Sequence, residues 1–220
     1  MKIRFFLVLV FCGLTIPIFG IEISLGSGVS YSPITSKLRV SDLGGEGTAT
    51  DHYNFGAVNV YLDATYVQAI LNYNMRVSGS YDSTGAFSGA GEYTNKETYF
   101  GVCILMKYPF IFGKLSLFPL LGMESDLNLS YTDKNGTDLK PLLTTIELEH
   151  LNKYFIKAGL GADVSLSKNI YVRPVFIFGY KLSSRLDKDI VDYYKSTYGL
   201  YRVEMPTTKL DIAILVGYRF

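Results

Sequence analysis

Two acidic residues two positions apart, Glu124 and Asp126, are the first candidates for chemistry in this chain. Side chains of a β-strand alternate between its two faces, so both carboxylates point the same way. Such a pair raises the pKa of one member and can act as general acid and base. The same face carries equal numbers of acidic and basic residues, so we expect salt bridges there rather than catalysis. Because the sequence also lacks a GxSxG motif and a Ser/His/Asp set, we expect no enzymatic activity and no catalytic residue.

Metal and cofactor sites have equally weak support in the sequence. His52 and His150 are the two histidines, both fall in expected loops, and neither has a Cys or second His at ligand spacing. Residues 133–138 resemble the start of a calcium loop, but the loop lacks Gly at its sixth position and Glu at its twelfth, where Thr144 stands. Asn135-Gly136 is more typical of a hairpin turn. We expect no metal and no cofactor, since there is also no glycine-rich phosphate loop.

The elements that carry these residues read as β-strands. Eight stretches alternate apolar residues with small or polar ones, which is the period of a strand. Each is as long as the ~9–11 residues that a tilted strand needs to cross a bilayer, or slightly longer. No stretch after residue 20 holds the ~18 consecutive apolar residues of a membrane helix. The expected strands are residues 21–32, 55–66, 68–80, 98–108, 115–129, 154–166, 170–183 and 210–220.

The connections between these stretches alternate in length. Short ones lie around Val67, at 109–114 and at 167–169, and long ones at 33–54, 81–97, 130–153 and 184–207. This pattern predicts an all-β fold, an eight-stranded antiparallel up-and-down transmembrane barrel with short periplasmic turns and four long extracellular loops. Within it, Pro119 and Pro174 predict a bulge or a strand rim, and residues 140–151 predict a short amphipathic helix.

One face of the expected strands is rich in charge and glycine. We expect it to line the lumen, because a crowded interior requires small residues and an unpaired buried charge costs several kcal/mol. The glycines on this face are Gly26, Gly28, Gly101, Gly122, Gly159, Gly161, Gly179 and Gly217. The expected lumen charge network is Glu22, Asp63, Arg76, Lys107, Glu124, Asp126, Lys157, Asp163, Arg173, Lys181, Asp211 and Arg219.

The opposite face is large and apolar, and its aromatic residues gather near the strand ends. A soluble, lipocalin-like barrel would turn this face inward, whereas a membrane barrel turns it toward lipid. The glycines and the balanced charges favour the membrane barrel, in which Tyr and Phe lie at the two interfaces. The expected interface residues are Tyr31, Phe55, Tyr66, Tyr108, Tyr154, Tyr180, Tyr218 and Phe220.

The first 20 residues are typical of a secretory signal peptide. Lys2 and Arg4 precede an apolar core at 5–14, and cleavage is expected after Gly20, which leaves a barrel domain at 21–220. Retention as an anchor helix, or lipidation at Cys12, fits the segment less well. The expected mature chain has one cysteine, Cys103, which we interpret as a small residue packed in a strand.

Composition limits the classes of partner. Hydrophobic residues make up 48% and aromatic residues 15% of the 220 positions, and this bias favours strands. The net charge of +1 becomes −1 once the signal segment is removed, and no basic run is present, so we expect no nucleic-acid partner. Expected partners are outer-membrane lipid and a host or surface ligand bound through the long loops.

Three segments resemble a known family. The ending Val216, Tyr218 and Phe220 resembles the assembly signal that the barrel-insertion machinery reads in bacterial outer-membrane barrels. Residues 157–172 resemble the sixth hairpin of small OmpW-like proteins, and residues 114–122 resemble their fifth strand. The resemblance implies a bacterial outer-membrane barrel that passes small hydrophobic compounds through a lateral opening. OmpX-like and OmpA-like barrels are close alternatives, and no residue matches a pore-lining motif.

Two functions from different classes follow. The first is a narrow or plugged channel for small molecules, hydrophobic ones included. The second is a surface scaffold or adhesin, in which an inert barrel holds long loops that bind a host or partner molecule. The segment 185–205 is rich in Tyr and charge, which suits recognition. A purely structural membrane protein is the third alternative.

Overall fold

The computed structural model describes residues 22–42, 45–84, 89–145, 148, 151–182, 192, 195–196, 202–204 and 206–220. The expected signal segment and His150 lie outside these residues. Among the described residues, no helix has the length and apolar character needed to span a membrane.

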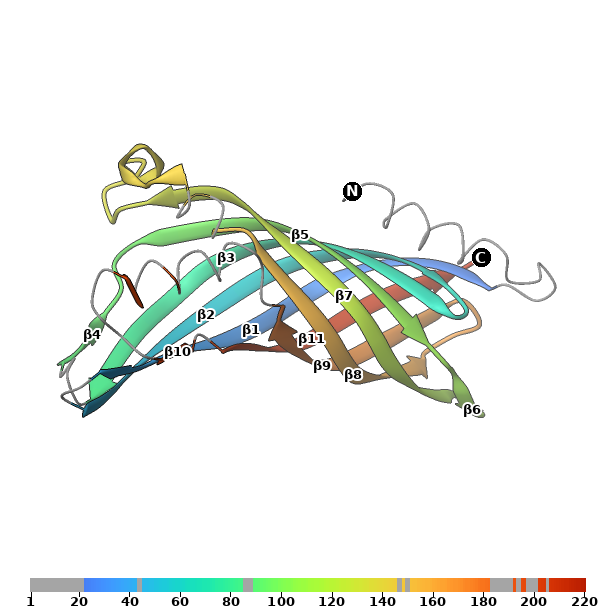
Figure 1. Cartoon of the computed structure of the whole chain (residues 1–220). Coiled ribbons are helices and arrows are strands. Elements are labelled where there is room, and N and C mark those ends of the chain that lie inside the picture. The colour runs from blue at the N-terminus through green and yellow to red at the C-terminus, as the bar shows by residue number, and fades with distance from the viewer. Residues whose placement is uncertain are drawn as a thin grey trace.

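Eight strands form a closed antiparallel ring, in the order β1-β11-β9-β8-β7-β5-β3-β2 and back to β1 (Figure 1). The expected all-β, eight-stranded antiparallel up-and-down barrel is therefore confirmed. The ring strands are β1 (Ile23–Asp42), β2 (Gly45–Ala64), β3 (Val67–Thr84), β5 (Lys96–Lys107), β7 (Leu115–Thr132), β8 (Lys153–Ser165), β9 (Ile170–Lys181) and β11 (Thr207–Arg219). Three short strands join it: β4 (Gly89–Glu92) pairs with β3, β6 (Phe110–Phe112) with β7, and β10 (Arg202–Glu204) with β1.

One end of the barrel holds the short connections, the start of β1 and the C-terminus (Figure 1). Two residues separate β2 from β3 and β6 from β7, and four separate β8 from β9, as the short turns in the sequence predict. The opposite end holds the long connections, and we call it the outer end. The barrel end with the short turns is called the inner end.

The prediction of a loop at 33–54 is wrong. β1 and β2 continue as one hairpin, in register from Ile23 opposite Ala64 to Asp42 opposite Gly45. Residues 33–42 add about 33 Å of strand at ~3.3 Å per residue. Ile34 still packs against Phe55 and Tyr99, but most residues beyond it are small or polar, so the apolar alternation that marks the barrel wall is lost although pairing persists. β3 follows the extension to Thr84, so the loop predicted at 81–97 is also partly strand.

The other two predicted loops are shorter than expected in their described parts. β7 runs to Thr132, and the 3-10 helix η2 (Lys140–Leu142) forms the start of the helix predicted at 140–151. The rest of that helix lies partly outside the described residues. Most of 184–207 lies outside them too, while β10 within it pairs with β1.

Prolines interrupt the ladders without shifting register. Pro119 stays in register opposite Leu160 of β8 and lies where β7 changes partner from β5 to β6. Pro174 pairs with Ile214 of β11, while the β8–β9 ladder is interrupted beside it. Proline lacks the N–H that a ladder needs, so pairing changes or is interrupted beside each proline, but both lie within strands and neither a bulge nor a strand rim occurs there. The register shifts lie instead at Asn54/Phe55 and at Thr98/Tyr99.

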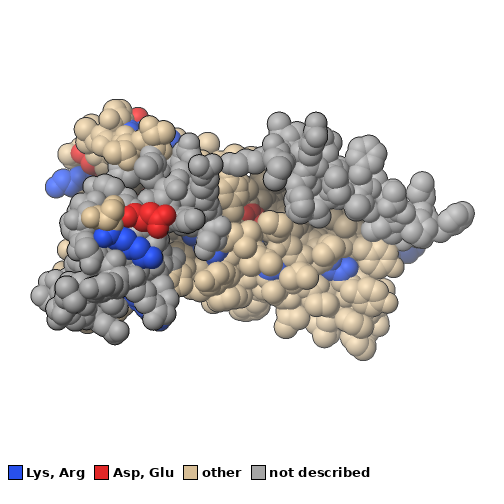
Figure 2. Space-filling view, in the orientation of Figure 1, with Lys and Arg blue, Asp and Glu red and all other residues tan. Residues whose placement is uncertain are grey.

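The outer wall of the barrel is apolar along every ring strand. Exposed residues of the wall include Leu25, Val29, Val58, Val60, Leu71, Met75, Met106, Leu121, Met123, Ile156, Leu160, Phe176, Phe178, Ile212, Ile214 and Val216. On the face that Figure 2 shows, most charged atoms lie toward the long connections, and only small charged areas interrupt the wall. The residues between these positions point inward, and ten charged residues of the strands are buried there.

The expected interface aromatics lie on this outer wall with one exception. Tyr31, Tyr66, Tyr108, Tyr154, Tyr180, Tyr218 and Phe220 are exposed. Phe55 is 2% exposed and points into the lumen, because it lies an odd number of residues from the outward Val58 and Val60. The prediction for Phe55 is therefore wrong.

Candidate functional site in the barrel lumen

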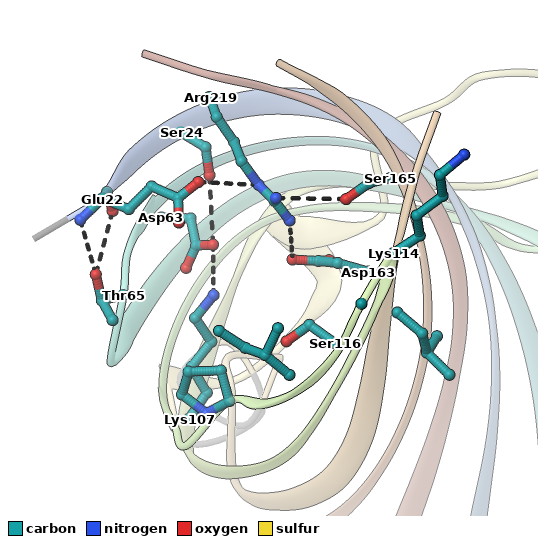
Figure 3. Close-up of a pocket in the computed structure, with 14 residues that line it drawn as sticks. Glu22, Ser24, Asp63, Thr65, Lys107, Lys114, Ser116, Asp163, Ser165 and Arg219 are labelled. Carbon is teal, nitrogen blue, oxygen red and sulfur yellow. Dashed lines mark hydrogen bonds and ion pairs between the residues drawn. The ribbon is translucent and has the colours of Figure 1, made fainter. Parts of the chain in front are cut away.

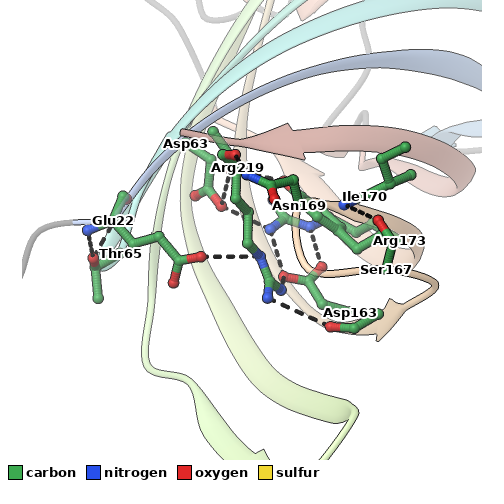
Figure 4. Close-up of polar contacts among 12 residues, drawn as sticks. Glu22, Asp63, Thr65, Asp163, Ser167, Asn169, Ile170, Arg173 and Arg219 are labelled. Carbon is green, nitrogen blue, oxygen red and sulfur yellow. Dashed lines mark hydrogen bonds and ion pairs between the residues drawn. The ribbon is translucent and has the colours of Figure 1, made fainter.

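The inner end of the lumen is built around Arg173 of β9. Its Nε lies 2.6 Å from Oδ1 of Asp163, and its Nη2 lies 2.7 Å from Oδ2 of Asp63. Lys107 Nζ lies 2.5 Å from the same Asp63 oxygen (Figure 3). Arg219 joins Asp163 at 3.4 Å (Figure 4). Because every carboxylate here meets at least one cation, the charges that the strands bury are compensated locally.

Aromatic rings surround the same guanidinium. The rings of Tyr61, Phe118 and Tyr171 each have their centroid 5.0 Å from Cζ of Arg173. The Arg173 side chain is 0% exposed. A guanidinium with bidentate carboxylate contacts and stacked rings has little freedom, so this cluster fixes the inner end of the barrel.

The middle of the lumen holds a second ionic cluster. Lys157 forms ion pairs with Glu124 and Asp211. Lys209 Nζ lies 3.0 Å from Glu124, 2.9 Å from Asp126 and 3.8 Å from Asp211. In the candidate acid–base pair, Glu124 therefore meets two lysines and Asp126 meets one of them, Lys209, which matches the expected salt bridges.

Apolar residues separate the two ionic clusters. From the inner end outward along β5, the inward residues after Lys107 are Leu105 and Cys103. Along β11, Leu215 and Ala213 lie between Gly217 and Asp211. The buried cluster is Tyr61, Ile70, Cys103, Leu105, Phe118, Leu120, Tyr171, Val175, Ile177 and Leu215. Cys103 is buried and unbridged within it, as a packed strand residue should be. The lumen therefore has an apolar layer that the charge count did not predict.

Glycines relieve crowding inside this layer. A Cβ on Gly217 would meet the Tyr61 hydroxyl and the Tyr171 ring, and one on Gly161 would meet the Phe118 ring. Gly179 is different, because its Cβ would have no neighbour closer than 3.5 Å.

Two small cavities lie on either side of the apolar layer. The inner one, of about 110 Å³, is lined by Asp63, Lys107, Asp163 and Arg219 among others (Figure 3). The second, of about 30 Å³, lies beside Asn72, Glu124 and Lys157. These volumes suit a few water molecules.

The outer mouth of the lumen is closed by Glu97 and its partners. Glu97 accepts a hydrogen bond from Arg76 at 2.9 Å and one from the Tyr99 hydroxyl at 2.6 Å, and it lies 3.7 Å from Lys153 Nζ. Beyond them, Tyr93 donates a hydrogen bond of 2.6 Å to Asp51. Burial and this bond raise the pKa of Tyr93 to about 12.

The ion pairs of the described residues include eleven residues of the expected lumen network. Lys181, also expected there, is half-buried at the outer end of β9. Glu22 lies at the inner rim, more than half exposed, with Arg219 at 3.1 Å. The expected set omits Lys209, Glu97 and Lys153, which the same alternation would have included if strands 210–220, 98–108 and 154–166 had begun one residue earlier.

His52 and the segment 133–138, whose residue types could bind a metal, have structural roles instead. His52 lies in β2 rather than in a loop, with Nδ1 3.3 Å from Thr35 Oγ1, because the β1–β2 hairpin continues past it. Asp133 accepts N–H hydrogen bonds of 2.8 Å from Asn135 and Thr137, and these bonds lower its pKa. Gly136 has φ +89°, which completes the expected hairpin turn. The described residues hold no group of three potential metal ligands.

Fold and lumen together define a closed eight-stranded β-barrel with an apolar exterior and an ion-paired, partly apolar interior. The chain matches no protein family and no curated protein. It is similar to Neisserial surface protein A (12% identity, TM-score 0.35, 89% of this chain and 99% of that one). It is also similar to Ail, the attachment invasion locus protein of Yersinia pestis (13%, TM-score 0.30, 89% and 99%). A third similar structure is the outer membrane protease OmpT of Escherichia coli (8%, TM-score 0.35, 92% and 99%).

Proposed function

We propose that this chain is a bacterial outer-membrane β-barrel protein with a sealed lumen, which serves as a rigid scaffold for binding at the cell surface. The observation that carries the proposal is the inverted surface of the barrel. Leucine, valine and aromatic side chains cover the outside, while Arg173, Lys157 and Glu124 are at most 3% exposed inside. Such a surface would be costly in water and is stable in acyl chains, where closure of the ring pairs the backbone.

The orientation follows from the two ends of the barrel. The short turns, the start of β1 and the C-terminus lie at the inner end of the barrel, which we assign to the periplasm. The β1–β2 extension therefore points away from the cell (Figure 1). We further propose that residues 1–20 direct export and that the insertion machinery reads Val216, Tyr218 and Phe220. The outward exposure of these three side chains supports that role. The resemblance of residues 157–172 to the sixth hairpin of OmpW-like proteins supports the same placement.

The contents of the lumen favour a scaffold over a channel. Two ionic clusters, an apolar layer and the Glu97 closure follow one another along the axis, and the two cavities have room for only a few water molecules. The β1–β2–β3 extension, by contrast, presents a long paired surface beyond the barrel. A rigid scaffold that displays such a surface suits recognition of a host or surface ligand. We propose no enzymatic role, since the lumen carboxylates are held in ion pairs.

Two measurements on the refolded mature chain test the proposal. Heat-modifiable migration on a gel is expected, because a closed barrel resists detergent until it is heated. Planar bilayers that contain the protein are expected to show negligible ionic conductance. A steady conductance of porin size would contradict the sealed lumen, and a chain that stays soluble and monodisperse without detergent would contradict the membrane assignment.

A further inference from the structure

The ammonium group of Lys153 lies in a box of aromatic rings at the outer mouth of the lumen. Its Nζ is 4.4 Å from the ring centroid of Tyr99, 5.3 Å from that of Phe55 and 5.8 Å from that of Tyr53. The Glu97 carboxylate lies at 3.7 Å. Three aromatic faces and one carboxylate are a typical environment for an organic ammonium ion.

We propose that this aromatic box is a binding site for alkylammonium ions from outside the cell, and that Lys153 occupies it when no ligand is bound. The inference rests on the proposed function, because the outer mouth must face the exterior. It goes further by assigning a ligand class to one site: a linear, protonated amine with an apolar stem, the chemistry of the lysine side chain that it replaces.

Lys153 is held less firmly than the other cations of the lumen. Arg173 has three carboxylate contacts of 2.8 Å or less and no exposure. Lys209 has two contacts of 3.0 Å or less and 2% side-chain exposure. Among the residues that the structure describes, Lys153 has one ion-pair contact, at 3.7 Å, and 17% of its side chain is exposed. An external cation therefore has both a route to the box and a weak competitor.

The walls of the box stay in place when Lys153 leaves. Glu97 keeps hydrogen bonds from Arg76 and from Tyr99, so its carboxylate remains oriented toward the vacated position. Phe55 and Tyr99 pack edge to face, with their centroids 5.6 Å apart, and are 2% exposed. Lys153 is the first residue of β8, so its side chain can rotate outward without opening the β7–β8 ladder.

Binding of n-butylammonium to the refolded full-length mature protein in detergent, followed by saturation-transfer NMR and titration calorimetry, tests the site. Wild-type protein is expected to bind the probe weakly, and Lys153→Ala about ten-fold more tightly, since the competing ammonium is gone. Neutral n-butanol at equal concentration is expected not to bind. In the Lys153→Ala background, Tyr99→Leu is expected to lose the gain, whereas Tyr99→Phe retains the ring and most of the binding.

Lys96→Ala is the matched control, because Lys96 is exposed and adjoins Glu97 in sequence but lies outside the box; it is expected to bind as wild type does. The inference is overturned if Lys153→Ala gains no affinity, or if n-butanol binds as well as the cation. If Lys153→Ala shows no heat-modifiable migration and so does not fold, Lys153→Ser replaces it. Absence of any probe binding to the wild type also overturns the inference. The proposed function has separate readouts in gel migration and conductance, so either can fail alone.

Discussion

Arg173 and Asp63 meet inside the barrel at 2.7 Å, although 110 residues separate them in the chain. They lie on β9 and β2, which are not neighbours in the ring. The pair therefore forms only when the sheet has closed on itself, and it ties closure of the barrel to the burial of charge.

Replacing Arg173 by Met should destabilise the barrel. The change leaves Asp63 with Lys107 and Asp163 with Arg219, so both carboxylates keep one partner but lose their shortest guanidinium contacts. We expect a loss of about 3 kcal/mol in the free energy of unfolding, measured by urea titration in lipid vesicles. Lys134→Met, in an exposed turn, should stay within about 0.5 kcal/mol of wild type. An Arg173→Met variant as stable as this control would show that the ion pairs do not support the barrel.

A methyl group on Gly217 should destabilise the folded barrel, since it would press on the Tyr61 hydroxyl and the Tyr171 ring. Gly217→Ala is expected to cost about 1–3 kcal/mol by the same titration, and Tyr61→Phe should recover part of the loss. Gly179→Ala is the matched control, because its methyl would meet only ordinary contacts. Equal effects of the two glycine variants would contradict the packing assigned to the lumen.

Part of this fold can be predicted from the sequence, and part cannot. Alternation finds the eight strands because each wall segment separates an apolar face from a small or charged one. It fails where the two faces are alike, as in the β1–β2 extension beyond Pro33, since pairing there depends on the partner strand. It also misses the extra residues at the two register shifts, because Val77 and Leu129 look like ordinary members of the pattern.

The candidate site was predictable in kind but not in arrangement. The count of inward charges predicts a paired network, and the pairs occur. Which lysine serves which carboxylate depends on the stagger between strands, and Lys209 meets Glu124 across 85 residues of sequence. The aromatic box needs Phe55 inside the lumen, and the odd spacing of Phe55 from the outward Val58 and Val60 already indicates that side.

The turn at Asp133 should respond to pH. Hydrogen bonds from backbone N–H groups lower the pKa of Asp133 in the folded turn, so the turn is fully supported above the ordinary Asp pKa of ~3.9 and loses this support as the pH falls through the lowered value. Amide exchange should therefore show protection of the Thr137 N–H at pH 5 that declines only below pH ~3.9. Asp133→Asn should remove the pH dependence. Protection that is the same at pH 2 and pH 5 in the wild type would contradict this assignment.

The absence of tryptophan from the sequence permits a direct test of which face meets lipid. Trp introduced at Leu160, which is 66% exposed on the barrel wall, should be strongly quenched by brominated phospholipid and weakly by aqueous iodide. Trp introduced at His52, in the extension, should show the reverse. Iodide quenching at position 160 without bromolipid quenching would contradict the account, because the apolar wall would then face water.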